Sequence, residues 1–166
     1  MSHTAVVVQQ KGNYVQMATP SGFRDILPTE AVARERISDK VRECFSSHGY
    51  LPVETPMLEN KSVLEQGGRV PESPFQLFDS DGSLLVMRPD ITLAIARMVA
   101  GRMGDATLPL RLRYSAPVVR EESTLSGQPR QFTQLGVELV GGEGVSGEAE
   151  VIALLAEALR ALDVPD

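Results

Sequence analysis

The sequence predicts an α+β fold in which an antiparallel sheet is flanked by helices. Two pairs of apolar, β-prone runs are each joined by a polar turn or loop, as in antiparallel hairpins. Segments with apolar residues at spacings of three and four, typical of amphipathic helices, precede, separate and follow these hairpins. Elements in this order predict helices packed on a sheet, and 166 residues are enough for one domain with its own core.

The N-terminal part is expected to contain a tail, a loop and a helix. Residues 1–18 carry no pattern that fixes a strand register, so we expect a flexible tail before a domain that spans residues 19–166. After a proline-containing loop, Thr29 has the chemistry of a helix N-cap, and Gly49 that of a residue that ends a helix. The expected buried face of this helix consists of Ile37, Val41, Cys44, Phe45 and His48.

The next segments are expected to form an extended stretch, a hairpin and a second helix. Pro52 and Pro56 restrict the extended stretch to a sheet edge or a strand end. Residues 75–88 form the clearest hairpin, because an Asp-Gly turn lies between an alternating run and an apolar run. A helix should follow from Asp90 onward.

The C-terminal part is expected to form a second hairpin and a last helix. The two strands, residues 110–121 and 130–142, are joined by the loop of residues 122–129. Residues 146–164 are strongly amphipathic, and the apolar face of this helix needs a partner. Because the chain stops soon after this helix, we expect a fragment or an unusually short member of a larger family.

Composition argues against several classes of function. The formal net charge of −6 offers no basic field for phosphates, so tight nucleic-acid binding is not expected. The single cysteine, Cys44, excludes an intrachain disulfide, and the two histidines, His3 and His48, lack ligand-like spacing, so no metal site is expected. No apolar run is long enough to span a membrane, and the N-terminus is unlike a secretory signal, so we expect a cytoplasmic protein.

Common catalytic motifs are also missing from the sequence. It contains neither GxxxxGKS/T nor GxGxxG, and its two histidines cannot assemble a Ser-His-Asp or Cys-His set. Covalent catalysis therefore has no evident nucleophile, and we expect no catalytic residue. Phosphoryl or nucleotidyl transfer stays open, because it depends on positioned charge more than on a nucleophilic side chain.

Polar side chains at the ends of apolar strands indicate a binding pocket. Along the last strand Gln134 and Glu138 share a face, and Gly136 between them leaves room for a ligand. Arg120, on the partner strand, can present a planar fork to a carboxylate, and Asp90 can accept from an ammonium group. Together these residues describe a pocket for a zwitterion.

Each of these residues also has a simpler interpretation. Arg120 can pair with Glu122 at the surface, which would contribute little to stability. Gln134 and Glu138 can lie on the solvated face of a half-buried strand, and Asp90 can simply cap the following helix. The pattern of residues leaves these alternatives open.

Several motifs in a fixed order resemble those of one known family. Its N-terminal signature, motif 1, amino-acid-binding segment and motif 2 are similar, in this order, to GFRDILP, LPVETPMLE, RPDIT and RYSAPVVRE with PRQFTQLGVE. Residues 19–166 thus resemble the class II catalytic core of histidyl-tRNA synthetase and its non-catalytic paralogue, the regulatory subunit of ATP phosphoribosyltransferase. The resemblance implies a six- or seven-stranded antiparallel sheet with flanking helices, truncated after motif 2, and a homodimer formed through the motif 1 region around Pro56.

The resemblance also implies roles for individual residues. The histidine-binding positions of the family fall on Asp90, Thr92, Arg120, Gln134 and Glu138. By this resemblance Asp90, Thr92 and Gln134 would hold the ammonium group of histidine. Arg120 would face the carboxylate of histidine, and Glu138 would meet its imidazole.

The loop after Arg120 departs from the synthetase pattern. It reads REESTLSGQPR where synthetases carry RxERPQxGRxR, which leaves Glu122 and Arg130 as residual nucleotide-facing residues. Two positive charges that would face ATP are missing, so a bound nucleotide would lose charge-assisted contacts. Asp90 also stands where synthetases typically have Glu, which retracts the carboxylate by about an ångström. We therefore expect no cofactor, and tRNA is not an expected partner.

These departures favour the regulatory paralogue. We expect a non-catalytic subunit that supports the first step of histidine biosynthesis and its feedback inhibition by histidine. The expected partners are the short-form catalytic subunit of ATP phosphoribosyltransferase, a second copy of the chain, and histidine as ligand. The alternative is the N-terminal part of a histidyl-tRNA synthetase, which would use ATP with Mg²⁺ to activate histidine and charge tRNA. A third interpretation is a fragment with neither activity.

Overall fold

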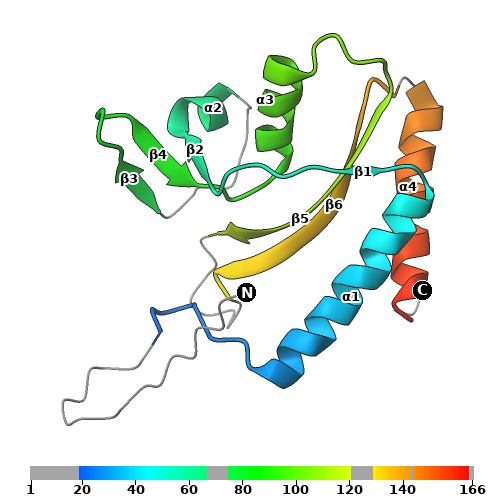
Figure 1. Cartoon of the computed structure of the whole chain (residues 1–166), viewed down its shortest axis with the longest axis horizontal. Coiled ribbons are helices and arrows are strands. Elements are labelled where there is room, and N and C mark those ends of the chain that lie inside the picture. The colour runs from blue at the N-terminus through cyan, green and yellow to red at the C-terminus, as the bar shows by residue number, and fades with distance from the viewer. Residues whose placement is uncertain (1–18, 67–74, 121–128, 143, 165–166) are drawn as a thin grey trace, which may run out of the picture.

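The computed structural model describes residues 19–66, 75–120, 129–142 and 144–164, and Figure 1 shows how its elements are arranged. None of the described helices is long and apolar enough to cross a membrane. The elements, in chain order, are α1 (Pro28–Ser47), β1 (Leu51–Pro52), β2 (Leu58–Asn60), α2 (Lys61–Gln66), β3 (Gln76–Phe78), β4 (Leu84–Met87), α3 (Thr92–Arg102), β5 (Leu110–Val119), β6 (Gln131–Val140) and α4 (Gly144–Ala161).

A long antiparallel ladder between β5 and β6 forms the centre of the molecule, and it confirms the second predicted hairpin. The ladder pairs Leu110 with Val140 at one end and Val119 with Gln131 at the other. β1 lies along the other edge of β5, but in parallel, so the expectation of antiparallel pairing is wrong for this strand. Parallel pairing is available here because a long connection, from β2 through α3, separates β1 from β5.

A second, smaller sheet has the strand order β2-β4-β3 and is antiparallel throughout, which confirms the first predicted hairpin. It meets the end of β5 through a hydrogen bond from the Val119 backbone N–H to the Arg88 carbonyl, at 3.1 Å. Pro89, which has no backbone N–H, follows directly and cannot extend this pairing. The described strands therefore form two three-stranded sheets, whereas the family resemblance implied one larger sheet.

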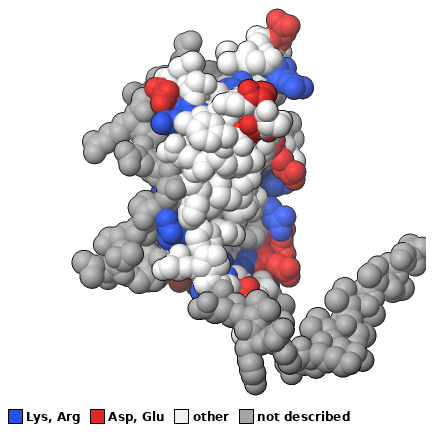
Figure 2. Space-filling model, turned by 90° about the vertical axis from the view of Figure 1, so that its left-hand side faces the viewer, with Lys and Arg blue, Asp and Glu red and all other residues white. Residues whose placement is uncertain are grey.

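The outer side of the molecule near this second sheet is poor in charge. Figure 2 views the molecule from the side on which β3 and β4 lie, and charged residues there border a largely uncharged area. Three large apolar side chains of the second sheet, Leu58, Leu77 and Phe78, are exposed by 38%, 39% and 75%. The second sheet thus offers apolar surface next to the motif 1 segment.

Two hydrophobic clusters cover opposite faces of the β5–β6 ladder. α1 and α4 lie together on one face and α3 lies on the other, as Figure 1 shows. Leu135 and Val137 of β6 pack against the first cluster, so the face of this strand opposite Gln134 and Glu138 is a core face. The first cluster contains Val41, Cys44, Phe45, Tyr50, Leu154 and Ala158, and the second contains Ile91, Ile95, Leu112, Tyr114 and Val118.

The first helix differs from its prediction in two respects. It begins at Pro28 and not after Thr29, because the fixed φ of proline suits the first helical position. Its buried face is narrower than predicted, since the side chains of Ile37 and His48 are 47% and 41% exposed. Lys40, which follows Ile37 by three residues, already donates to the carbonyl of Ala161, the last residue of α4, at 3.2 Å.

The end of the first helix agrees with its prediction. Gly49 has a φ of +82°, a left-handed conformation that glycine adopts without strain. Tyr50, the next residue, is only 1% exposed and lies in the cluster between α1 and α4. The turn at Gly49 therefore redirects the chain from α1 into the core before β1 begins.

Candidate functional site

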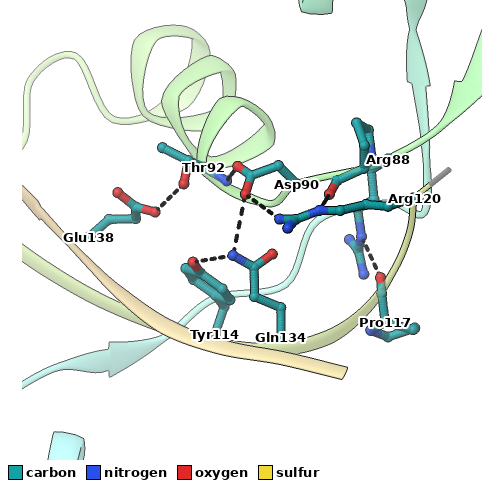
Figure 3. Close-up of polar contacts among 9 residues, drawn as sticks. Arg88, Asp90, Thr92, Tyr114, Pro117, Arg120, Gln134 and Glu138 are labelled. Atoms are coloured by element: carbon teal, nitrogen blue, oxygen red, sulfur yellow. Dashed lines mark hydrogen bonds and ion pairs between the residues drawn. The ribbon is translucent and has the colours of Figure 1, made fainter. Parts of the chain in front are cut away.

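The five residues predicted to bind a ligand lie together on the α3 side of the β5–β6 ladder. Asp90 lies between β4 and α3, Thr92 is the first residue of α3, and Arg120 directly follows β5. Gln134 and Glu138 point from β6 toward the same region, as Figure 3 shows. The prediction that the two strand ends and the helix start meet in space agrees with this arrangement.

Asp90 occupies the centre of the cluster. Its Oδ1 accepts a hydrogen bond from the Thr92 backbone N–H at 2.7 Å, so Asp90 satisfies one free N–H at the start of α3, although Ile91 is the N-cap residue and the simpler interpretation as a cap is met only in part. Its Oδ2 lies 3.5 Å from Nη2 of Arg120 and 3.3 Å from Nε2 of Gln134. One carboxylate therefore connects the helix start to both strands.

The Arg120 guanidinium is fixed from two directions. Its Nε donates to the Pro89 carbonyl at 2.8 Å, and its guanidinium carbon lies 5.2 Å from the centre of the Phe132 ring. The side chains of Arg120 and Asp90 are 30% and 22% exposed, so the pair is partly withdrawn from water. Glu122, the alternative partner of Arg120, lies outside the described residues. These contacts hold the Arg120 fork at the edge of the cluster.

Gln134 is only partly satisfied. Its amide nitrogen donates to Asp90 Oδ2 and to the Tyr114 hydroxyl, each at 3.3 Å. Its carbonyl oxygen is buried and has no hydrogen-bond partner among the described residues. An unpaired buried acceptor costs about 1–3 kcal/mol. The cluster thus contains a vacant acceptor that a ligand N–H could occupy.

Glu138 is a half-buried carboxylate at the other end of the cluster. It accepts a hydrogen bond from the Thr92 hydroxyl at 2.8 Å. Burial raises its pKa above the ordinary value and the nearby Asp90 charge adds to this, while the Thr92 hydrogen bond partly opposes it. A cationic group placed between Glu138 and Asp90 would stabilise both carboxylates.

Tyr114 also belongs to the cluster, although the sequence did not predict it there. It faces Gly136 across the ladder, and a Cβ on Gly136 would lie 2.4 Å from the Tyr114 hydroxyl oxygen. Gly136 therefore makes room for the tyrosine ring, and the expectation that it directly makes room for a ligand needs this correction. Burial, with the charges of Glu138 and Asp90, raises the pKa of Tyr114 to about 12, so its hydroxyl remains protonated near neutral pH.

The sequence did not single out Arg88, although its hydrogen bonds hold the segment that leads to Asp90. Its side chain is 3% exposed, and its Nη1 donates to the Thr55 and Pro56 carbonyls at 2.6 and 3.0 Å. Its Nε donates to the Pro117 carbonyl at 3.0 Å. Arg88, two residues before Asp90, thereby connects the motif 1 segment to β5, and Figure 3 shows its contact with Pro117. The signal in the sequence is a basic residue directly after an apolar strand.

Arg130, predicted to face a nucleotide, packs against aromatic rings. Its guanidinium carbon lies 4.7 Å from the centre of the Phe75 ring and 5.9 Å from that of Phe23. Its backbone N–H donates to the Gly22 carbonyl at 2.8 Å. These contacts attach the GFRDILP segment to the start of β6. Glu122, the other predicted nucleotide-facing residue, lies outside the described residues.

The fold and the polar cluster together define a class of protein. A β5–β6 ladder with helices on both faces, and a polar cluster beside α3, belong to the class II aminoacyl-tRNA synthetase type of core. The sequence profile described as "Histidyl-tRNA synthetase" matches residues 22–166. The chain belongs to the histidyl-tRNA synthetase family.

Known relatives include both branches of this family. The chain is 44% identical to an ATP phosphoribosyltransferase regulatory subunit of Symbiobacterium thermophilum, over 87% of this chain and 37% of the relative. It superposes with a TM-score of 0.83, at 37% identity, on a Bacillus halodurans structure titled as an ATP phosphoribosyltransferase regulatory subunit/histidyl-tRNA synthetase, over 93% of this chain and 40% of that one. The histidyl-tRNA synthetase of S. aureus gives a TM-score of 0.73 at 26% identity, over 88% of this chain and 35% of the synthetase chain. The chain thus spans about two fifths of the length of the relatives that it matches.

Proposed function

We propose that the chain is part of a non-catalytic regulatory subunit of ATP phosphoribosyltransferase, which supports the first step of histidine biosynthesis and its feedback inhibition by histidine. Curated relatives at 37–44% identity carry this name. The loss of two cations from the loop after Arg120 supports the same function, because nucleotide chemistry depends on such charges. A cytoplasmic location fits this biosynthetic role.

The ligand of the proposed subunit is free histidine. The observation that carries this proposal is the buried, unpartnered Gln134 carbonyl oxygen, which lies in one cluster with the Asp90 carboxylate. In the proposed arrangement Asp90, Thr92 and Gln134 hold the ammonium group. Arg120 pairs with the ligand carboxylate, and Glu138 accepts from the imidazole N–H. Two carboxylates and one guanidinium form a net-negative cluster, which favours a zwitterion that carries a protonated imidazole.

Two protein partners belong to the proposal. One is the short-form catalytic subunit of ATP phosphoribosyltransferase, since a regulatory subunit acts through contacts that differ between the two states of its partner. The other is a second copy of this chain, docked through the motif 1 region. The exposed side chains of Leu58, Leu77 and Phe78 support this second contact, because apolar surface of this kind is typical of subunit interfaces.

The test of the ligand is calorimetric titration of the chain with histidine. Asp90→Asn removes the charge that would face the ammonium group, and we expect an affinity loss of about 10–100-fold. Glu35→Gln serves as the matched control, because Glu35 is an exposed carboxylate on α1, on the face of the β5–β6 ladder opposite the cluster. Equal affinities for Asp90→Asn and Glu35→Gln would contradict the proposed pocket.

The test of the regulatory role is co-purification with the short-form catalytic subunit, with and without histidine. We expect a complex whose inhibition by histidine depends on the chain, and Asp90→Asn should preserve assembly while it weakens inhibition. A catalytic subunit that responds to histidine equally with and without the chain would exclude the regulatory role. This outcome is independent of whether histidine binds to the isolated chain.

A second candidate function is that of a histidyl-tRNA synthetase fragment, which would use ATP with Mg²⁺. The structural match to the S. aureus synthetase favours it, as does the preserved set of Arg120, Gln134 and Glu138. Histidine-dependent exchange of pyrophosphate into ATP is the discriminating measurement. Exchange at rates typical of a synthetase would support this second function over the regulatory one.

A further inference from the structure

The junction of α1 and α4 brings together three side chains that commonly bind metals. Cys44 and His48 are one helical turn apart at the end of α1, and Glu157 reaches them from α4. The thiol sulfur, an imidazole nitrogen and a carboxylate oxygen all lie within 4.8 Å of one another. The sequence predicted no metal site, because it could not place Glu157 beside the other two residues.

The hydrogen bonds of His48 determine which of its ring nitrogens is free. Nδ1 lies 3.0 Å from the Cys44 carbonyl oxygen, which can only accept, so Nδ1 carries a proton. The neighbouring Ser47 hydroxyl, 3.3 Å from Nδ1, already donates to the same carbonyl. Neutral His48 therefore directs the lone pair of Nε2 outward. A hydrogen bond from Nδ1 to a backbone carbonyl is the arrangement that usually orients a metal-binding histidine.

The partner of Nε2 is the carboxylate of Glu157. The two atoms are 3.3 Å apart, longer than the 2.7–2.9 Å of a typical charge-assisted hydrogen bond. Both are acceptors when His48 is neutral, so a proton or a metal cation must lie between them. Two ligands at about 2.0–2.1 Å from a tetrahedral zinc ion are themselves separated by roughly 3.3 Å. The observed separation fits two ligands of one metal ion, and it also fits an ion pair between protonated His48 and Glu157.

We propose that Cys44, His48 and Glu157 form a binding site for Zn²⁺ or a metal of similar preference at the α1–α4 junction. The set of one sulfur, one nitrogen and one oxygen ligand suits zinc, and water would complete a tetrahedral coordination. The two helices supply the ligands jointly, so the bound ion links α1 to α4. On binding, the Cys44 thiol releases its proton to solvent as the sulfur–metal bond forms, and the affinity therefore increases with pH.

The surroundings of Cys44 set the conditions for binding. Burial raises the pKa of this thiol, and the charge of Glu157 adds to the effect, so the free thiol stays protonated near neutral pH. The thiol is buried, while the side chains of His48 and Glu157 are 41% and 54% exposed. A metal ion can thus approach from the solvent side through His48 and Glu157 and reach the sulfur last.

The experiment is metal titration of the purified chain with Zn²⁺ and, separately, with Co²⁺. We expect one Zn²⁺ per chain in competition with a chromophoric chelator, and a thiolate-to-cobalt absorption band in the near ultraviolet. Cys44→Ala should abolish this band. Glu157→Gln should keep the band but weaken Zn²⁺ binding at least tenfold, because the thiolate stays and one ligand is lost.

Controls separate a metal site from a loss of folding. Glu157 is more than half exposed, so Glu157→Gln should fold normally even if Cys44→Ala does not. Glu148→Gln makes the same chemical change elsewhere on α4 and should leave Zn²⁺ affinity unchanged. Failure to bind Zn²⁺ stoichiometrically, or equal affinities for Glu157→Gln and Glu148→Gln, would show that a proton alone joins His48 to Glu157.

Discussion

The pKa of a carboxylate is shifted in opposite directions on the two faces of the β5–β6 ladder. On the α4 side, Glu150 accepts two hydrogen bonds of 2.7 Å from Arg111 and a third of 2.9 Å from Tyr50. The Arg111 hydrogen bond is the main reason that the pKa of Glu150 lies at about 2. On the α3 side, Glu138 accepts from the Thr92 hydroxyl, and burial raises its pKa.

The two faces of this strand pair therefore have different roles: one packs as core, and the other carries the polar cluster. Successive residues of a strand point to opposite faces, so β6 directs Leu135 and Val137 into the core and Gln134 and Glu138 into the polar cluster. On the first face the Glu150 carboxylate is fully paired, although the buried Nε of Arg113, on the same face of β5 as Arg111, has no hydrogen-bond partner among the described residues. The second retains a buried acceptor on Gln134 and a carboxylate whose charged form burial disfavours. We infer that the unpaired Gln134 acceptor and the raised pKa of Glu138 mark the α3 face as the one that binds an amino acid.

The largest effect is expected from a cavity on the α1–α4 face. Phe45 is 3% exposed and lies in the cluster between these helices. Phe45→Ala should lower the free energy of unfolding by about 3–5 kcal/mol, measured by urea denaturation. Because Phe45 lies on the opposite face from the polar cluster, the folded fraction should keep its histidine affinity. A parallel loss of affinity would show that the two faces are coupled.

A smaller effect is expected where the polar face is packed most tightly. In Gly136→Ala the new Cβ would lie 2.4 Å from the Tyr114 hydroxyl oxygen and 2.5–3.0 Å from its ring carbons, so the side chain must move. We expect a loss of about 1–3 kcal/mol in the free energy of unfolding. In a Tyr114→Ala background the same substitution should cost clearly less, because the obstructing ring is gone. A double-mutant cycle with no coupling would contradict the tight contact between these residues.

Much of the difference between the two faces could be predicted from the sequence, because it depends on the alternation of residues along each strand and on the turns between strands. The β5–β6 hairpin, the core face with Leu135 and Val137, and the gathering of the binding residues follow from period-two patterns and loop lengths. The histidine-binding roles came from the family resemblance and stay predictions.

The missed features depend on register and on long-range contacts. Gly136 suggested an open space, but only the register of the ladder shows that Tyr114 lies across from it and fills that space. The site of Cys44, His48 and Glu157 depends on how α4 packs on α1, which no local pattern encodes. The parallel β1–β5 pairing likewise depends on the path of the whole intervening chain.

A still smaller change in stability is expected when the vacant acceptor on the polar face is removed. Gln134→Met keeps the approximate volume of the side chain but deletes the buried carbonyl that has no partner among the described residues. The long hydrogen bonds of its amide nitrogen are lost as well, so the two effects should nearly offset one another. We expect the free energy of unfolding to change by less than about 1 kcal/mol in urea denaturation. Histidine binding, measured by calorimetry, should fall at least tenfold, in contrast to Phe45→Ala.

The subtlest prediction concerns how stability changes with pH on the two faces. The folded pKa of Glu138 lies above its ordinary 4.5, so its contribution to stability is present at acidic pH and is lost as pH rises through the folded value. For Glu150 the folded pKa of about 2 lies below 4.5, so its contribution is present above pH 4.5 and is lost as pH falls toward 2. Urea denaturation without ligand over this pH range should therefore give opposite trends. Relative to the parent chain, Glu138→Gln should gain stability as pH rises, whereas Glu150→Gln should lose it. Equal slopes for both variants would contradict the difference between the two faces.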